Sequence, residues 1–310
     1  MDIEELSSQS FWQEFAGGEF HISNEPKLIT VNQVRPSAEI LEETKRLFEL
    51  EGYAHLYQQL DLDLSTYTKL LKKMFNAGLP PVFAFVYDEF WEMQARLSYI
   101  IESFLGEGSK LMPTLWIWYV DPAREREILK EVDKELVTRT LYSGFYGPHR
   151  DKGKKGLNAD GTPKILSFWL PLTEANPLNS CIYIVPANRD QTYRQEDEDS
   201  WFFKQPDIRA LPAKPGDILF WNEAVIHWGS RPAPGRNIPP RLSIGFEYIS
   251  KDCLDKCTHF DIDAVPDFKT RLEIIALQFK LYITSEGFPD VLLNFIRAHD
   301  RLVRSGRETF

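Results

Sequence analysis

The chain has 310 residues, 43% of them apolar, and a formal net charge of −10. This length supports one large domain or two small ones, each with a substantial core. The excess of acidic groups disfavours nucleic acid and anionic membranes as main partners, because both carry dense negative charge.

Cysteine usage and the N-terminus both favour a reducing compartment. Three cysteines in a chain of this length do not form a disulfide framework. Residues 1–5 show neither a basic stretch nor an apolar run, so no signal peptide is expected. No apolar run approaches the roughly 18 residues that a membrane span needs. A cytoplasmic protein is the prediction.

The first third of the sequence is largely helical in pattern. Ser37 is the expected N-cap of a helix that runs to about residue 50. A second helix is predicted over 65–76, where Gly78 and Pro80 end it. A third is predicted over 83–105, because its apolar residues recur at helical spacing. Residues 1–106 are therefore interpreted as a helical layer that packs on the rest of the chain.

The pattern changes to short strands after Gly106. Strand-forming runs alternate with Pro, Gly and Asn, which predicts an antiparallel sandwich or barrel with a mainly β core. The predicted strands are 114–120, 165–170, 181–185, 208–211, 218–221, 225–228 and 242–248. Between them, 121–137 is highly charged and is interpreted as a solvated helix or mobile excursion, and 141–145 is expected to be extended.

Helical spacing returns over 266–304. We predict a single domain over 1–310, in which a β-rich core at 107–250 lies between the helical layer of 1–106 and the C-terminal helices of 251–310. No internal repeat or low-complexity tract interrupts this plan.

Two of the six histidines stand out as metal ligands. His149 and Asp151 are two residues apart, so on an extended segment their side chains point to the same side. His227 lies in a predicted strand of the β-rich part. Two imidazoles and one carboxylate form the facial triad of non-haem Fe(II) oxygenases. The alternative is that both are ordinary histidines of a β-sandwich.

An arginine on the last predicted strand strengthens the functional interpretation. Alternation places Arg241, Ser243 and Gly245 on one face of that strand. A buried guanidinium needs an anion, since an unpaired buried charge is costly. Gly245 is expected to leave room beside that anion. The other arginines after His227, Arg231 and Arg236, lie in a proline-rich stretch that is expected to be a surface loop.

With these residues in place, the segment from about 110 to 250 resembles the phytanoyl-CoA dioxygenase family of Fe(II)/2-oxoglutarate-dependent oxygenases. The motifs that carry the resemblance are His149-x-Asp151, Phe168–Leu172, Asn179–Pro186, Pro215–Phe220, His227 and Arg241-x-Ser243. The resemblance implies a double-stranded β-helix, the cupin-like jelly-roll, with N- and C-terminal helices packed outside. One departure is Ser180, which stands where the family usually has glycine.

The resemblance also implies a reaction and its cofactors. It implies Fe(II) held at His149, Asp151 and His227. It implies 2-oxoglutarate whose far carboxylate pairs with Arg241 beside the Ser243 hydroxyl, with Trp169 near the cosubstrate. It further implies that 2-oxoglutarate and O₂ are consumed, that succinate and CO₂ are released, and that an unactivated C–H bond of a small organic molecule is hydroxylated.

Two other functions remain open from the residues. One is a metal-binding jelly-roll without oxygenase activity, and the other is a zinc-type hydrolase that uses the same three ligands. The substrate, the carbon attacked, the choice among hydroxylation, desaturation and cyclisation, and the oligomeric state are not determined by the sequence. Nor is it determined whether the substrate is a CoA ester.

Candidate substrate residues lie beside the ligands. They are Arg150, Lys152 and Trp228. With Lys154 and Lys155, the first two form a basic cluster that could steer an anionic substrate, or that could simply be a solvated loop. Cys253, Cys257 and His259 could bind zinc, but a fourth ligand is not evident and their role is left open.

Overall fold

The structure is a computed structural model that describes residues 2–123, 147–195, 203–233, 237–254, 258–282 and 289–302. Almost all of the charged stretch predicted at 121–137, and the extended stretch predicted at 141–145, lie outside the described residues. Within the described ranges, none of the helices combines the length and apolar character that a membrane span needs.

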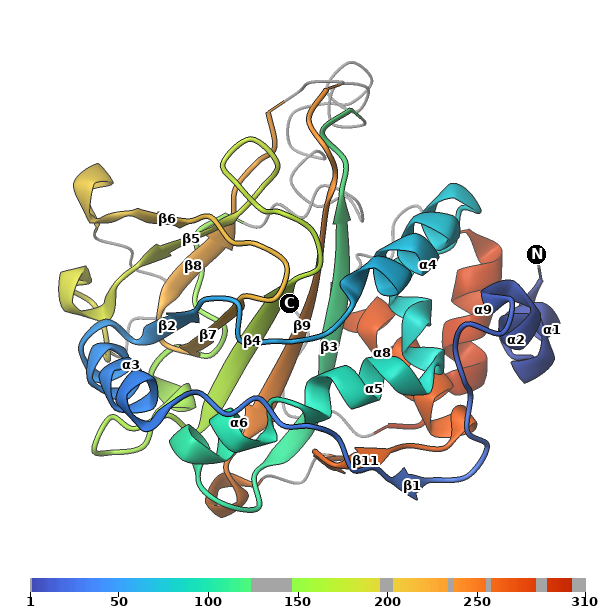
Figure 1. The fold of residues 1–310 in the computed structure, drawn as a ribbon, viewed down its shortest axis with the longest axis horizontal. Coiled ribbons are helices and arrows are strands. Elements are labelled where there is room, and N and C mark those ends of the chain that lie inside the picture. The colour runs from blue at the N-terminus through green and yellow to red at the C-terminus, as the bar shows by residue number, and fades with distance from the viewer. Residues whose placement is uncertain are drawn as a thin grey trace.

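Two antiparallel sheets form the core of the fold (Figure 1). The major sheet has the order β10 (Phe260–Asp261), β3 (Lys110–Val120), β9 (Arg241–Ile249), β4 (Ile165–Pro171), β7 (Ile218–Asn222), β2 (Tyr53–Leu56). The minor sheet has the order β6 (Arg209–Leu211), β5 (Ile182–Val185), β8 (Ile226–Gly229). A separate ribbon pairs β1 (Lys27–Leu28) with β11 (Ala264–Val265).

Helices cover one face of the major sheet (Figure 1). The helices are α1 (Ile3–Leu6), α2 (Gln9–Ala16), α3 (Ala38–Glu51), α4 (Leu64–Asn76), α5 (Asp88–Ala95), α6 (Ser98–Leu105), α8 (Phe268–Tyr282) and α9 (Asp290–His299). N-terminal and C-terminal helices pack together, since α1 contacts α9, and α8 also packs on β3 of the major sheet. The predicted mainly β fold with helices outside is confirmed.

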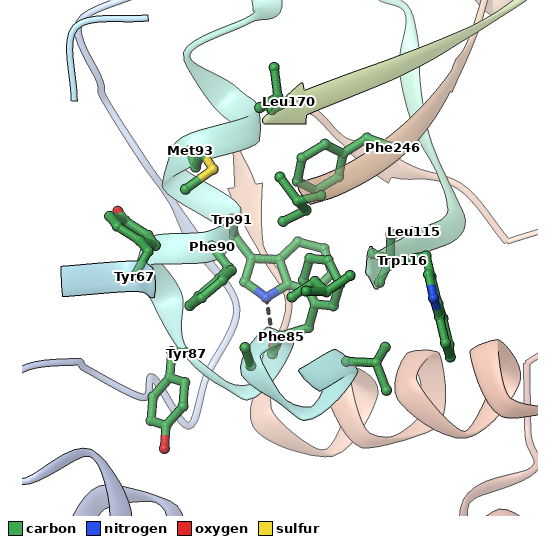
Figure 2. Packing of buried hydrophobic residues seen from close by; sticks show 14 of the residues in the cluster. Tyr67, Phe85, Tyr87, Phe90, Trp91, Met93, Leu115, Trp116, Leu170 and Phe246 are labelled. Carbon is green, nitrogen blue, oxygen red and sulfur yellow. Dashed lines mark hydrogen bonds between the residues drawn. The ribbon is translucent and has the colours of Figure 1, made fainter. Parts of the chain in front are cut away.

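The two faces of the major sheet carry different side chains, as strand alternation requires. The helix-facing side belongs to a large apolar core. In Figure 2, Trp91 of α5 lies among Phe85, Leu115, Leu170 and Phe246, and its indole N–H donates to the Phe85 carbonyl at 2.8 Å. Burial of so many aromatic rings is a main source of stability, because each removes a large apolar area from water.

The opposite face of the major sheet meets the minor sheet. A second buried cluster joins Trp169 and Leu219 of the major sheet to Ile182, Ile184 and Leu211 of the minor sheet. Two facing antiparallel sheets with interdigitating side chains are the jelly-roll arrangement expected from the resemblance. The polar side chains predicted to bind metal and cosubstrate lie in this space between the sheets.

Most local predictions are confirmed. Ser37 caps α3, since its hydroxyl accepts from the Ile40 amide at 3.3 Å. The seven predicted strands correspond to β3, β4, β5, β6, β7, β8 and β9, with ends that differ by a few residues at most. These elements carry strong alternation or clear caps, which is why the pattern identified them.

The single helix predicted over 83–105 is wrong. A 3₁₀ helix at Pro81–Val86 is followed by extended backbone at Tyr87 (φ −95°, ψ 140°), and α5 and α6 then come in turn. The Asp88 carboxylate at the break is buried and pairs with Lys27 and Arg271, both at 2.7 Å. These tertiary contacts interrupt a helix that apolar spacing alone would have continued.

The N-terminal layer also contributes a strand to the core. Tyr53–Leu56 forms β2, which pairs with β7 at the edge of the major sheet. Gly52 ends α3 in the left-handed region (φ 77°), where a Cβ would lie 2.4 Å from a methyl of Val225. Only glycine therefore allows α3 to turn directly into β2 at this close approach.

Candidate metal centre

The three predicted ligands come together between the sheets. His149 and His227 form an isolated antiparallel bridge, with each amide donating to the other's carbonyl at 3.2 and 2.9 Å. Asp151 lies two residues after His149, and its two carboxylate oxygens lie 3.6 Å from the two Nε2 atoms. One ligand atom from each residue lies within 4.8 Å of the others, so the group could hold a metal ion.

Backbone carbonyls orient both imidazoles. The Nδ1 of His149 lies 2.8 Å from the Gly147 carbonyl, and that of His227 lies 3.2 Å from the Val225 carbonyl. An Nδ1–H that donates to a carbonyl leaves the Nε2 lone pair facing the centre. Burial lowers the pKa of His227 to about 4, helped by His149 and opposed by Asp151, so this imidazole is neutral at pH 7 and able to bind a metal.

Two side chains that the sequence analysis missed hold the Asp151 carboxylate. The Trp221 indole N–H donates to Oδ2 at 3.4 Å, and the Ser167 hydroxyl lies 3.3 Å from the same oxygen, within hydrogen-bond reach. The Trp221 ring also packs on His227, with centroids 4.6 Å apart. Ser167 and Trp221 both lie on predicted strands, with side chains that point between the sheets. Strand alternation could have predicted that direction, but it does not reveal which of the inward-pointing residues contacts a metal ligand.

Arg241 lies buried in the same space. Its side chain is 1% exposed, its Nη1 donates to the Ser243 hydroxyl at 2.7 Å, and its Nε has no hydrogen-bond partner. No carboxylate of the described residues pairs with it. Burial lowers the pKa of this guanidinium to about 9. Trp169, which was expected beside Arg241 and Ser243, has its ring centroid 5.5 Å from the guanidinium carbon of Arg241.

Gly245 lies against an aromatic ring of the neighbouring strand. A Cβ at this position would lie 2.8 Å from the ring of Trp118, on the neighbouring strand β3. The missing side chain therefore makes room for this indole, and the space expected beside a bound anion stays a prediction. Of the two other arginines, Arg231 is exposed, and Arg236 lies outside the described residues.

The basic side chains beside the ligands point toward acids of the protein. The Arg150 side chain is 4% exposed and pairs with Asp190 at 2.6 Å. Lys152 Nζ lies 3.5 Å from a carboxylate oxygen of Glu247 and 3.9 Å from one of Glu223. Both side chains thus form ion pairs with carboxylates of the protein itself. The remaining members of the basic cluster, Lys154 and Lys155, are exposed.

Trp228 lies next to His227 on β8, so alternation sends the two side chains to opposite faces of the minor sheet. Its half-buried ring stacks on Tyr183 at 5.7 Å and on Phe203 at 6.0 Å. It therefore lies on the sheet face away from the three ligands.

The zinc hypothesis for the cysteine-rich stretch receives no support. The Cys253 thiol lies 3.6 Å from the Asn158 side-chain oxygen. Cys257 lies outside the described residues. The only group of metal-ligating side chains found among the described residues is that of His149, Asp151 and His227.

Comparison with known proteins agrees with this geometry. Residues 140–233 match the model of the phytanoyl-CoA dioxygenase (PhyH) family, which confirms the resemblance over that segment. Among solved structures, the chain is similar to the epimerase SnoN in complex with Fe³⁺, alpha ketoglutarate and nogalamycin RO. The TM-score is 0.50 and the identity 17%, with 68% of this chain and 84% of that chain covered. This likeness confirms the jelly-roll fold.

Two further structures show weaker similarity. AviO1 from Streptomyces viridochromogenes is 14% identical with a TM-score of 0.49, over 73% of this chain and 99% of that one. HygX from Streptomyces hygroscopicus, solved with nickel, 2-oxoglutarate and hygromycin B, is 14% identical with a TM-score of 0.45, over 67% and 87%. A search of curated proteins gave no match.

Proposed function

We propose that this protein, whose residues 140–233 match the phytanoyl-CoA dioxygenase family, is an Fe(II)- and 2-oxoglutarate-dependent oxygenase that hydroxylates a C–H bond of a small organic molecule. The observation that carries the proposal is the buried Arg241 guanidinium. It lies against Trp169 of the cluster between the sheets, and Trp221 of the same cluster packs on His227 of the His-Asp-His group. A dicarboxylate that chelates a metal through one end needs a metal site for that end and a cationic site for its other carboxylate.

The donor set fits these cofactors. His149, Asp151 and His227 would hold the iron, because two imidazoles and one carboxylate suit a non-haem Fe(II) site with open positions. Arg241 and Ser243 would hold the far carboxylate of 2-oxoglutarate, and the partnerless Nε of Arg241 supports this assignment. When bound, iron, 2-oxoglutarate and O₂ supply the oxidising chemistry, with release of succinate and CO₂.

The chain's own contribution is placement and exclusion of water. Trp118, Trp169 and Trp221 line the inner face of the major sheet, and the last two are almost fully buried. Such a wall would keep water from a bound cosubstrate and would strengthen its charge pairing with Arg241, since electrostatic interactions are stronger in a low-dielectric setting.

The same arginine argues against the two alternatives. A zinc-type hydrolase could use the three ligands, but it has no need for a buried unpaired cation between the sheets. A metal-binding jelly-roll without activity would carry the cost of that cation without an anion to offset it. Both alternatives therefore leave Arg241 unexplained.

The substrate that we propose is a small organic molecule. SnoN and HygX were solved with the small molecules nogalamycin RO and hygromycin B. We propose a small organic substrate for this chain also, with nucleic acid disfavoured by the net charge of −10. The cytoplasmic location expected from the sequence stays a prediction.

The decisive experiment is an anaerobic titration with Fe(II) and then with 2-oxoglutarate, followed by visible spectroscopy. A charge-transfer band that requires both additions would support the oxygenase. Tight zinc binding with ester hydrolysis, and no such band, would favour the hydrolase. A screen for substrate-dependent succinate release over small acids, amino acids, lipids and CoA esters would then narrow the substrate.

Substitution of the ligands provides the complementary test. We expect His149→Ala, Asp151→Ala and His227→Ala each to abolish the band and turnover while the fold is retained, because each removes one of three protein ligands. His21→Ala is the matched control, since His21 is paired with Glu89 on the surface. Normal activity and Fe(II) affinity in any of the three variants would show that the residue is not a ligand.

A further inference from the structure

A fully buried carboxyl group lies behind the metal ligands without a role in binding them. Glu223 directly succeeds β7 in the chain and is 0% exposed. Gly156 packs against it so closely that a Cβ there would lie 2.4 Å from the Glu223 Cβ. One carboxyl oxygen, Oε1, meets the Ser167 hydroxyl at 2.8 Å, whereas Oε2 makes no hydrogen bond and faces Lys152 Nζ at 3.9 Å.

The main chain of Glu223 fixes the two residues after Asp151. Its carbonyl accepts from the amides of Lys152 and Gly153, at 3.2 and 3.0 Å. The segment that carries the carboxylate ligand is therefore attached at its C-terminal side to Glu223, and at its N-terminal side to His227 through the bridge with His149.

The side chain reaches Asp151 through one hydroxyl. Ser167 Oγ lies 2.8 Å from Glu223 Oε1 and 3.3 Å from Asp151 Oδ2. A hydroxyl has one hydrogen, so it donates to only one of these carboxyl groups at a time. If the Ser167 hydroxyl donates to Asp151, its 2.8 Å contact with Glu223 is a hydrogen bond only when the Glu223 carboxyl group is protonated and donates to the hydroxyl oxygen. Burial raises the pKa of Glu223, which favours the protonated form that donates, whereas Lys152 and the Ser167 hydrogen bond act in the opposite direction.

We propose that Glu223 is a positioning residue which, through the Ser167 hydroxyl, holds the Asp151 carboxylate toward His149 and His227 and so sets the metal affinity of the three ligands. This inference rests on the proposed metal-binding function. Partners that orient a ligating carboxylate typically change metal affinity or activity by about 10–100-fold when they are removed.

The test compares three variants with the wild-type protein. Fe(II) affinity is measured under anaerobic conditions by calorimetry, Ni(II) affinity is measured as a redox-stable check, and the melting temperature is measured without metal. We expect Ser167→Ala and Glu223→Leu to weaken metal binding by roughly 10–100-fold. Glu223→Gln keeps the shape and supplies an N–H donor to Ser167, so its affinity should stay within about threefold of wild type.

A buried serine elsewhere provides the matched control. Ser109 is 4% exposed and donates to the Gly106 carbonyl at 2.6 Å, away from the ligands. Ser109→Ala should leave metal affinity unchanged. In the 2-oxoglutarate-dependent reaction, Ser167→Ala should lower kcat with little change in the KM for 2-oxoglutarate, because Arg241 and Ser243 hold the far carboxylate separately.

The outcomes separate the two proposals. If the wild-type protein binds neither Fe(II) nor Ni(II), the proposed function fails. If it binds them and Ser167→Ala and Glu223→Leu bind equally well, the positioning role is overturned while the function stands. An equal loss of affinity in Glu223→Gln and Glu223→Leu would also overturn it. Should Glu223→Leu not fold, Ser167→Ala and Glu223→Gln still decide the question.

Discussion

Ser180 is strained in a way that its side chain does not relieve. Its φ is 77°, in the left-handed region, and its buried hydroxyl has no hydrogen-bond partner. A non-glycine residue in this region costs roughly 1–2 kcal/mol, and glycine usually stands here in the family that the sequence resembles. The strain lies one residue before Cys181, which is close enough to Arg241 to affect its pKa, so the strained loop borders the site that we propose for the cosubstrate carboxylate.

We therefore predict that Ser180→Gly raises the free energy of unfolding by roughly 0.5–1 kcal/mol, which is the relieved strain less the greater freedom of glycine in the unfolded chain. Urea denaturation measures the change. Ser109→Gly, at a position with ordinary φ, is the control and should be destabilised. A loss of stability in Ser180→Gly would mean that the buried hydroxyl contributes more than the strain costs.

A second prediction concerns the effect of removing the Arg241 guanidinium on the KM for 2-oxoglutarate. Loss of a buried charge-assisted pair typically costs about 2–5 kcal/mol, and each 1.4 kcal/mol is about tenfold in affinity. Arg241→Ala should therefore raise the KM for 2-oxoglutarate at least ~30-fold. The exposed Arg231 is the matched control, and Arg231→Ala should stay within a few-fold of wild type. Steady-state kinetics in 2-oxoglutarate check both, and a large effect confined to Arg231→Ala or Arg236→Ala would contradict the assignment.

Sequence patterns predict ligands better than the residues that support them. His149, Asp151 and His227 were predictable because metal-ligating side chains are few and their spacing is specific. The roles of Ser167 and Glu223 could not be predicted, because they depend on how neighbouring strands are paired. In the sequence, a residue two positions away on the same face looks equally suitable for such a role.

At the scale of elements, β3 and β9 share the longest pairing in the major sheet. The pairing sets Trp118 opposite Ser243, and its indole lies against Gly245, two residues along β9, so that any side chain on Gly245 would collide with the ring. The indole in turn forms part of the wall beside Arg241 and Trp169. A small residue on one strand thus determines where an aromatic ring of its neighbour lies.

Gly245→Ala should displace this ring and destabilise the protein by about 1–3 kcal/mol, the usual cost of overpacking. Thermal or urea unfolding measures the stability. We also expect a higher KM for 2-oxoglutarate, since the ring borders the proposed cosubstrate site. Trp118→Phe removes bulk from the same contact, so the double variant with Gly245→Ala should recover part of the lost stability. No recovery would show that the ring and the glycine are not coupled.

Helices were predicted less well than strands for a specific reason. The stretch 83–105 has helical spacing throughout, but the buried Asp88 needs Lys27 and Arg271, which lie far away in the sequence. Likewise β2 is a strand because β7 offers it an edge, and not because four residues show a pattern. Elements that long-range partners determine are beyond what local periodicity predicts.

At the scale of the whole molecule, the metal centre joins separate parts of the fold. His227 belongs to the minor sheet, whereas Asp151 is held by Ser167 and Trp221 of the major sheet. A bound metal would therefore link the two sheets, and unfolding would have to release it. Ligands that bind only the folded state stabilise it by mass action.

We predict that Fe(II) or Ni(II) at about 100 times its dissociation constant stabilises the protein by about 2.7 kcal/mol. Differential scanning fluorimetry with and without metal measures the shift, and a chelator should reverse it. Asp151→Ala should show no shift at the same metal concentration. A shift of equal size in that variant would place the bound metal at another site.

The strand order of the major sheet bears on whether a fragment limited to the residues matched by the family model would fold. Residues 140–233 include β4 and β7 but exclude β3, β9 and β2, which pair with them or complete the sheet. A fragment with these limits would lack Arg241 and would expose bare strand edges on both sides of the β4–β7 pair, a known route to aggregation. We therefore expect that the segment matched by the family model does not fold independently of the strands on either side of it.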